Sequence, residues 1–301
     1  MTNNKERWGK VRNVGRYINE GKWDDYWQTS ISHAIEKTCL IRGYPLEEII
    51  ENLTYTETLY LTLRGELPTK EEARLLNAVL CSIPDHQFVA STAPAARFAA
   101  SAFPDSPIPG IAAGILTMGS YTVSPQDSAD FINESHELMA SKDLTIKETA
   151  IDVVSECLEN KKRIPGFGHP TYRNVDPRSE ALKKVAKECG FWGEKSQIYE
   201  AIHKEFVRVT GKEIPLNIDG MMACILNEMG FDPLEMAGIA AVSYMCGIIA
   251  HVVEEIKEGV PLRIIPPEHG AVYTGPDERH INLRLRSVKT RCPISVDIAG
   301  S

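Results

Sequence analysis

The sequence has little of what marks a nucleic-acid-binding, disulfide-stabilised or zinc-binding protein. Its 33 Lys and Arg against 41 Asp and Glu give a formal net charge of −8, whereas a protein whose main partner is nucleic acid is more often basic. The cysteines are odd in number and form no CxxC pair, which favours buried free thiols in a reducing compartment. They are Cys39, Cys81, Cys157, Cys189, Cys224, Cys246 and Cys292.

Neither a secretory leader nor a clear membrane span is indicated. The first ten residues, MTNNKERWGK, lack an apolar core, so we expect no signal peptide. The most apolar stretch, Met236–Val253, is interrupted by Ser243, Tyr244 and Gly247 and followed by Glu254. A buried helix is therefore expected there in preference to a bilayer span, and the protein is expected to be cytoplasmic.

Apolar residues recur mainly at helical spacing, and no convincing alternating run exceeds five residues, so the expected class is all-α. Start signals support this: Thr69 with Glu72, Asp176 before Pro177, and Asp232 with Glu235 are typical helix caps. The strand candidates are Ile264–Ile265 and Ser295–Ile298. Expected helices are Trp27–Cys39, Pro45–Leu53, Thr56–Leu63, Thr69–Cys81, Thr92–Ala102, Gly110–Met118, Ser128–Ala140, Lys147–Leu158, Pro177–Cys189, Ser196–Val209, Met221–Met229 and Met236–Val253.

Two irregular loops, Lys161–Arg178 and Pro261–Arg279, are rich in Gly, Pro, His and Arg. In a helical protein such loops often carry the chemistry. In the first, Gly166 and Gly168 can bring backbone close to a ligand, and His169 can donate a hydrogen bond or carry a proton. Its arginines, which suit phosphate or carboxylate, are Arg163, Arg173 and Arg178. From composition alone, a glycine turn with a satisfied His and solvated charges is equally plausible.

Other polar residues allow more than one interpretation. Asp219 lies between apolar residues and before Gly220, which suits a desolvated general base or a helix N-cap, and the two are compatible. His86 taken alone is more often structural than a ligand. His251 and Glu254 share a helix face, where a buried polar pair is expected rather than a metal site.

From Gly166 to Arg178 the sequence resembles citrate synthases and citryl-CoA lyases, whose pattern here is roughly G-[FY]-G-H-x-x-Y-[RK]-x-x-D-P-R. The resemblance extends over residues 27–280, and the N-terminal half is most similar to the citryl-CoA lyase branch. The other matching segments are Arg42–Pro45, Gly65–Pro68, Asn217–Gly220, Gly247–Glu254 and Tyr273–Gly275.

The resemblance implies an almost all-helical subunit that works as a homodimer. A large domain would comprise residues 1–123 and 231–301, and a small domain residues 124–230. Coenzyme A is implied as part of the substrate, with a keto or hydroxy acid as the other small molecule. No metal or further cofactor is implied.

The family's catalytic roles carry over to matching positions. Asp219 matches the base that takes a proton from the α carbon of the thioester, or returns it in cleavage. His169 matches the residue that polarises the ketone, and His86 one that lines the keto-acid site. Arg178 matches an arginine that grips a substrate carboxylate.

The family's coenzyme A contacts also have counterparts. Arg173 matches a basic residue near a phosphate of coenzyme A. The backbone around Ile164, Pro165, Gly166 and Gly168 matches the loop that cradles the adenine.

Three positions depart from the family pattern. Thr122 stands where the family has a histidine that stabilises the enol. Loss of this donor raises the activation barrier by about 3–4 kcal/mol, unless Thr122 or Tyr121 donates instead. Tyr244 and Pro266 stand where arginines bind carboxylates, although Arg263 lies close by in sequence. We therefore expect a substrate with fewer carboxylates than citrate, or one with an apolar or aromatic group facing Tyr244.

The prediction is a carbon–carbon lyase or synthase acting on a 3-hydroxyacyl-CoA, used in the cleavage direction. Ordinary citrate synthesis is one alternative. A non-catalytic CoA-binding subunit is another, favoured by the missing histidine and opposed by the presence of both Asp219 and His169.

Overall fold

The computed structural model describes residues 27–119, 122–270 and 272–281, and the chain divides into two units after Leu262. In the described part of the second unit, which begins at Arg263, the one helix is α14 (Pro267–Gly270), and Ile264–Ile265 is not a strand. The strand predicted at Ser295–Ile298 lies outside the described residues.

A small antiparallel sheet stands at the start of the described chain, where β1 (Ser32–Ala34), β2 (Cys39–Ile41) and β3 (Tyr44–Pro45) pair in order. The helix predicted for Trp27–Cys39 is therefore wrong. Its apolar residues Trp27, Ile31 and Ile35 follow helical spacing but are all exposed, so no core selects a helix. The break predicted at Arg42–Pro45 comprises the turn Arg42–Gly43, where φ is positive, and strand β3.

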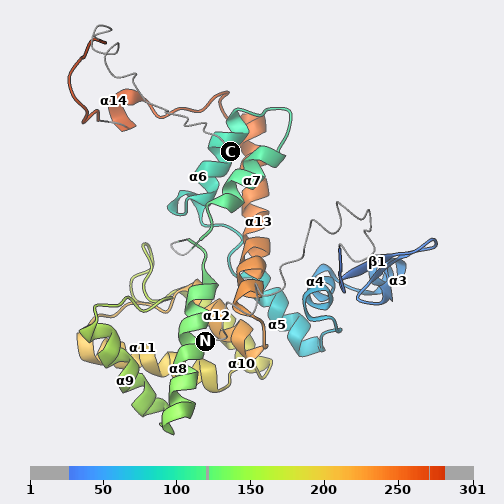
Figure 1. Ribbon diagram of the computed structural model, residues 1–301, viewed down its shortest axis with the longest axis vertical. Helices are drawn as coiled ribbons and strands as arrows, with labels where there is room; N and C mark the ends of the chain where they lie inside the picture. The colour runs from blue at the N-terminus through green and yellow to red at the C-terminus, as the bar shows by residue number, and fades with distance from the viewer. Residues whose placement is uncertain (1–26, 120–121, 271, 282–301) are drawn as a thin grey trace, which may run out of the picture. The chain divides into compact units, whose positions relative to one another are not determined.

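The rest of the described first unit is helical, as predicted (Figure 1). Apart from the short 3₁₀ turn Gln87–Val89, its helices are α3 (Leu46–Asn52), α4 (Tyr55–Arg64), α5 (Lys70–Cys81), α6 (Thr92–Ser101), α7 (Ile108–Leu116), α8 (Pro125–Lys142), α9 (Ile146–Glu159), α10 (Pro177–Glu188), α11 (Glu194–Thr210), α12 (Ile218–Glu228) and α13 (Pro233–Glu258).

The predicted helix starts are confirmed where side chains cap them. Thr69 and Glu72 form a capping box on α5, and Asp232 with Glu235 forms another on α13. Asp176 caps α10 by accepting from the Arg178 N–H at 3.1 Å. These bonds satisfy N–H groups that have no partner inside the helix.

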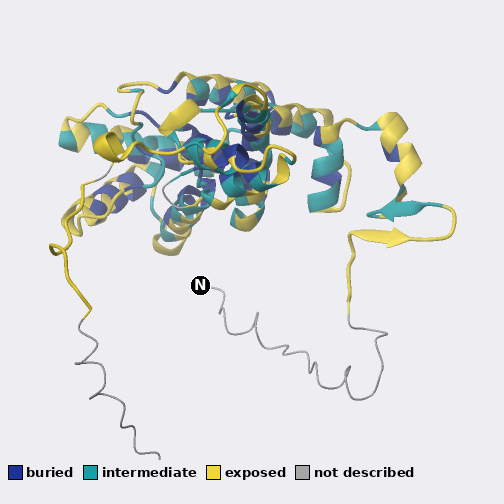
Figure 2. Cartoon of the chain, turned by 90° about the horizontal axis from the view of Figure 1, so that it is seen from above, coloured by how far each residue is buried: buried dark blue, intermediate teal, exposed yellow. Residues whose placement is uncertain are grey.

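Small residues bring α6, α7 and α13 into close contact. A Cβ placed on Gly110 would lie 2.9 Å from Val252 Cγ2, and one on Gly114 would lie 3.0 Å from Ile248 Cγ2. Both glycines also face α6, whose Ala96 is fully buried. Buried residues, dark blue in Figure 2, gather among the helices, while exposed residues, in yellow, lie on the outside.

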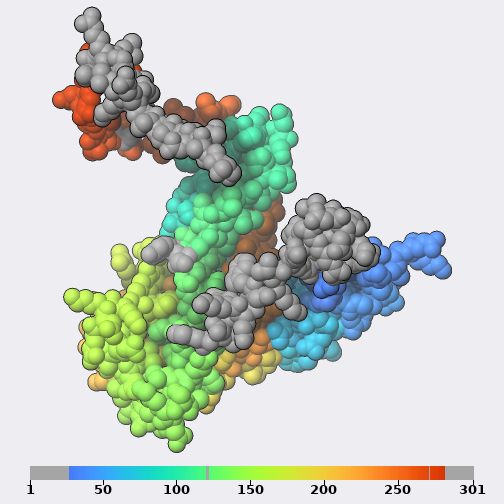
Figure 3. Space-filling view, in the orientation of Figure 1, coloured from blue at the N-terminus to red at the C-terminus, as the bar shows by residue number. Residues whose placement is uncertain are grey.

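A second group of helices packs around α12. This helix contacts α8, α10 and α11, while α9 contacts α8 and α11. In the space-filling view, α8 and α9 lie side by side in green and yellow-green (Figure 3). Residues 218 and 220–227 of α12 are buried, which makes this helix the centre of the group. The domain boundaries at 123/124 and 230/231 stay a prediction.

Helix α13 is long and apolar enough to cross a membrane by length and composition, and it is the one such helix in the described part of the chain. In the structure it contacts α5, α6, α7, α8 and α12. The core helix of a globular protein has the same length and composition. The contacts of α13 with five other helices agree with the buried helix predicted for Met236–Val253.

The six described cysteines are free thiols. Cys157, Cys189 and Cys224 are buried as predicted, but Cys81 and Cys246 are exposed, because they lie on the outward faces of α5 and α13. Cys292 lies outside the described residues.

Candidate active site

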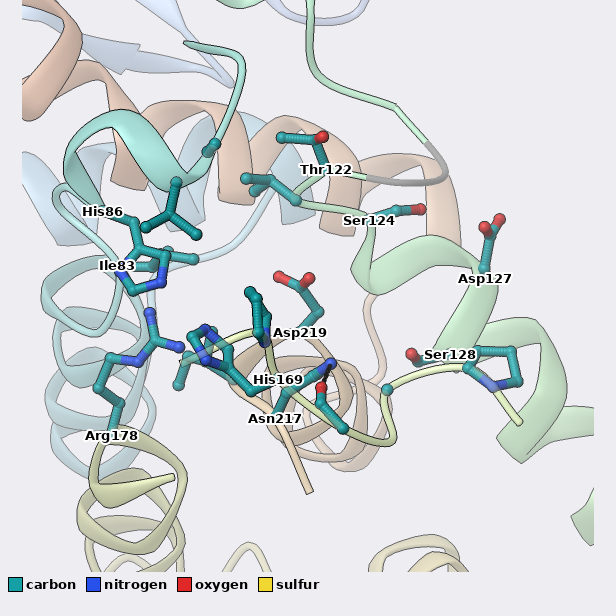
Figure 4. A pocket seen from close by; sticks show the side chains of 18 of the residues that line it. Ile83, His86, Thr122, Ser124, Asp127, Ser128, His169, Arg178, Asn217 and Asp219 are labelled. Atoms are coloured by element: carbon teal, nitrogen blue, oxygen red, sulfur yellow. Dashed lines mark hydrogen bonds between the residues drawn. The ribbon is translucent and has the colours of Figure 1, made fainter. Parts of the chain in front are cut away.

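A cavity of about 350 Å³ lies among segments that are distant in sequence. Its walls come from residues 83–90, the start of α8, the loop before α10, the start of α12 and the middle of α13 (Figure 4). It brings together most of the residues that the sequence singled out: His86, Thr122, Pro165, Gly166, Gly168, His169, Arg178, Asp219 and Tyr244.

Asp219 sits in the first turn of α12 and points its carboxylate into the cavity (Figure 4). It is not the N-cap; Asn217 fills that role by accepting from the Gly220 N–H at 3.0 Å. Asp219 Oδ1 is buried and has no hydrogen-bond partner. Burial raises the pKa of Asp219 to about 6, although the Arg178 charge and the Ser124 backbone N–H oppose the rise.

His169 is held in one neutral form. Its Nδ1 accepts hydrogen bonds from the backbone N–H groups of Thr171 and Tyr172, both at 3.0 Å. Nδ1 is therefore an acceptor, and the proton of the neutral ring is on Nε2. Burial lowers the pKa of His169, and the charges of Arg178 and His86 lower it further.

His86 lies beside His169, with ring centroids 4.8 Å apart. Its Nε2 is buried without a hydrogen-bond partner. Burial, and then the Arg178 charge, lowers the pKa of His86. Two neutral imidazoles thus face one another, and Tyr172 stacks on His169 at 4.6 Å.

Arg178 approaches the two histidines from the start of α10 (Figure 4). Asp176, whose side chain is fully buried, accepts from Nε at 3.0 Å and from a terminal nitrogen at 2.8 Å. The other terminal nitrogen, NH1, is buried without a partner. Asp176 thus holds the guanidinium in place and leaves one nitrogen for a ligand.

Tyr244 reaches the cavity from α13 and is only 1% exposed. Burial raises the pKa of Tyr244, which the neighbouring Thr92 and Arg178 partly oppose. Its hydroxyl forms no well-made hydrogen bond within the described chain. The sequence predicts an apolar or aromatic substrate group facing Tyr244, and the structure adds a buried polar hydroxyl at this position.

Thr122 lines the cavity across from Asp219 (Figure 4). Two backbone hydrogen bonds tie it to Gly119, at 2.9 and 2.7 Å. Ser124, two residues on, also lines the cavity. Tyr121, the other proposed replacement for the missing histidine, lies outside the described residues.

The two glycines before His169 serve different purposes. A Cβ on Gly166 would lie 2.1 Å from the Tyr199 hydroxyl and 2.7 Å from Gly220 Cα, so internal packing requires this glycine. The Tyr199 hydroxyl also donates to the Pro165 carbonyl at 2.5 Å. Gly168 has a φ of +84° and nothing near its missing Cβ, which suits close approach of a ligand.

Two predicted residues lie outside the cavity wall. Arg173 is exposed, and Ile164 is buried in the core. The side chain of Ile164 therefore packs the loop from behind. Whether Arg173 and this backbone meet coenzyme A stays a prediction.

Several lining residues were not predicted. Asp127 and Ser128 come from the first turns of α8, and Ile83 and Val89 from the segment around His86. No local pattern marks them, because tertiary packing alone brings them to the wall. Asn217 also lines the cavity and donates to the Gly168 carbonyl at 3.0 Å, which links two matching segments.

His251 lies outside this cavity, in a network of paired charges. Its Nε2 lies 3.0 Å from Asp85 Oδ1, and its Nδ1 lies 3.4 Å from Arg97. Arg97 also binds Glu254 at 2.5 Å and the buried Glu255 at 2.6 Å. The predicted polar interaction of His251 is therefore wider than a pair.

The chain is similar to proteins of one known family. The family model described as citrate synthase, C-terminal domain, matches residues 68–268. Citrate synthase 2 of Bacillus subtilis is 31% identical over 239 residues, which cover 79% of this chain and 60% of that protein. The chain thus spans about three fifths of the length of this relative.

Solved structures give a fuller match. The citryl-CoA lyase from Hydrogenobacter thermophilus is 36% identical with a TM-score of 0.78, over 86% of this chain and 99% of that chain. The citrate synthase of Thermoplasma acidophilum, solved with carboxymethyl coenzyme A and oxaloacetate, is 24% identical over 79% of this chain and 64% of that chain, with a TM-score of 0.62. The second likeness supports the fold alone.

Proposed function

The chain belongs to the citrate synthase family, and from this premise we propose that it is a carbon–carbon lyase acting on a 3-hydroxyacyl-CoA thioester. Cleavage would give a shorter acyl-CoA and a carbonyl compound, and condensation would be the reverse.

The observation that carries the proposal is the buried carboxylate of Asp219, whose Oδ1 has no hydrogen-bond partner, in one cavity with His169 and His86. Buried polar atoms are normally hydrogen-bonded, so several unpaired ones around one cavity are typical of a binding site for a polar molecule. A carboxyl group with a pKa of about 6 can both give and take a proton near neutral pH.

In cleavage, the proton of the C3 hydroxyl passes to the free Nε2 of His86 while the C2–C3 bond breaks. His169 donates from Nε2 to the carbonyl oxygen as it forms. The bond electrons move to the thioester enolate, and protonated Asp219 returns a proton to the α carbon. Exchange with solvent then restores both groups for the next turnover.

Two observations support lyase use over citrate synthesis. The citryl-CoA lyase from Hydrogenobacter thermophilus matches this chain over nearly its whole length. In addition, Thr122 and Tyr244 take the positions where the synthase pattern has a histidine and an arginine.

Coenzyme A is proposed as the carrier of the acyl group. Gly168 leaves its backbone accessible, and Arg163 also lines the cavity. Exposed Arg173 offers a further cation for phosphate. A homodimer in the cytoplasm is also proposed, and no metal is part of the proposal.

A non-catalytic CoA-binding subunit remains the alternative of another class. A binding module needs neither a base with a raised pKa nor a histidine fixed in one tautomer, so the geometry favours catalysis. Isothermal titration with coenzyme A, followed by mass spectrometry of 3-hydroxyacyl-CoA thioesters incubated with the protein, separates the two. Cleavage is expected; tight binding without turnover on any thioester would favour the subunit.

A further inference from the structure

We infer that the cavity takes a 3-hydroxyacyl-CoA whose C3 carries one carboxylate, held between Arg178 and Tyr244, together with an apolar substituent. The carbonyl product is then a 2-oxo monocarboxylic acid. The inference rests on the proposed function and names its substrate class.

Arg178 offers a single contact to an anion. Asp176 already accepts from two of its nitrogens, so NH1 is the free donor. One N–H group suits one oxygen of a carboxylate. A fully available guanidinium would instead hold both oxygens.

Tyr244 supplies a second donor nearby. Its hydroxyl is buried and forms no well-made hydrogen bond within the described chain. A tyrosine hydroxyl is protonated at neutral pH, and burial raises the pKa of Tyr244 further. A neutral hydroxyl can donate to the other carboxylate oxygen, but it brings no charge to balance a second carboxylate.

The charges around the cavity also limit the ligand. Among the described lining residues, the lysines and arginines are Arg163 and Arg178, and the acids are Asp127 and Asp219. Of these cations, Arg178 is the one that approaches the two histidines (Figure 4), so a second carboxylate on C3 would have no cation of its own. Burying an unbalanced carboxylate is strongly unfavourable.

The position of Arg178 fixes where the carboxylate sits. Its guanidinium approaches both His86 and His169 in the cavity (Figure 4), so it lies close to the oxygen that these rings would contact. The carboxylate is thus attached directly to the carbonyl carbon. Beside His86, the apolar side chains of Ile83, Val89 and Ala90 line the wall and suit the remaining substituent.

The test compares two thioesters that differ in this substituent. Citramalyl-CoA has a methyl group and one carboxylate on C3, whereas citryl-CoA has a carboxymethyl group in place of the methyl. Both the dissociation constant and kcat/KM are measured for each. We expect citramalyl-CoA to bind and to be cleaved to acetyl-CoA and pyruvate at least tenfold better.

Tyr244→Phe tests the proposed donor. It should raise KM for citramalyl-CoA about tenfold or more and change kcat less, because it removes a contact present in the bound substrate. Tyr60→Phe is the matched control, since that buried hydroxyl binds Glu72 on α5, outside the cavity. The control should leave KM unchanged.

The outcomes separate the two proposals. Cleavage that favours citryl-CoA would overturn the substrate class and leave the lyase intact. Equal KM for Tyr244→Phe and wild type would overturn the role of Tyr244. If neither thioester is cleaved, the proposed lyase activity is wrong. The dissociation constants then still test the substrate class: tighter binding of citramalyl-CoA than of citryl-CoA supports it, while equal or absent binding overturns it.

Discussion

Two clusters of histidine and acidic side chains, one around His251 and one in the cavity, meet at Asp85–His86. They differ in whether their polar atoms are paired. Around His251, the charges of Asp85, Arg97 and Glu255 are paired. In the cavity, atoms of His86, Arg178, Asp219 and Tyr244 are buried without partners. Paired groups stabilise a fold, whereas unpaired ones weaken it unless a ligand completes them.

The paired cluster also positions the unpaired one. The Gly247 N–H of α13 donates to the Pro84 carbonyl at 2.9 Å, and a Cβ at this glycine would lie 2.3 Å from that oxygen. With the bond between His251 and Asp85, this contact fixes the segment that carries His86. Substitutions in the two clusters should therefore separate stability from activity.

The largest effect is expected from Asp219→Asn in the cavity. Loss of the proton-transfer group should lower kcat by about 10²–10⁴-fold, measured as acetyl-CoA release, with coenzyme A affinity retained. Asp127→Asn, which removes a carboxylate from the cavity wall away from the histidines, is the control and should stay within a few-fold of wild type. A similar loss in both variants would contradict the role of Asp219.

His169→Ala should follow, with a loss of about 10²–10³-fold in kcat, because one donor to the developing charge disappears. His136→Ala changes a half-buried histidine that is paired with Glu194 outside the cavity, and it should have no such effect. Retention of more than a tenth of wild-type kcat by His169→Ala would contradict the assignment.

In the paired cluster, Glu255→Gln should lower the free energy of unfolding by about 3 kcal/mol, since it leaves Arg97 short of a buried partner. Glu254→Gln removes the exposed partner and should cost under about 1 kcal/mol. Urea unfolding at pH 7 measures both. A large loss of kcat in Glu255→Gln with an unchanged free energy of unfolding would contradict the assignment of this cluster to stability.

The smallest effect concerns pH. The pKa of Asp219 is raised from 3.8 to about 6 in the fold, so the folded state binds this proton more tightly than the unfolded state does. Stability from this group is full below about pH 4 and is lost as pH rises through 6. Asp219→Asn should therefore stabilise the protein at pH 7 by about 1–3 kcal/mol and change little at pH 4.

Much of the fold follows from local sequence. The capped starts of α5, α10 and α13 are visible as Thr69, Asp176 and Asp232 with their partners. The hairpin at β1 and β2 is not, because pairing between strands decides it and the spacing of Trp27, Ile31 and Ile35 imitates a helix.

The site is only partly visible in the same way. His169 and Asp219 stand in motifs that can be recognised. The pairing of Arg178 with Asp176 and the buried hydroxyl of Tyr244 depend on how α10 and α13 meet the cavity, and no spacing reveals them. Asp127 and Ser128 were missed for the same reason.

The most direct test of the central claim is mass spectrometry of citramalyl-CoA and citryl-CoA after incubation with wild-type protein and with Asp219→Asn. The account predicts a shorter acyl-CoA and a 2-oxo acid from wild type, and almost none from the variant although it still binds coenzyme A. Equal cleavage by both proteins, or none by wild type, would contradict it.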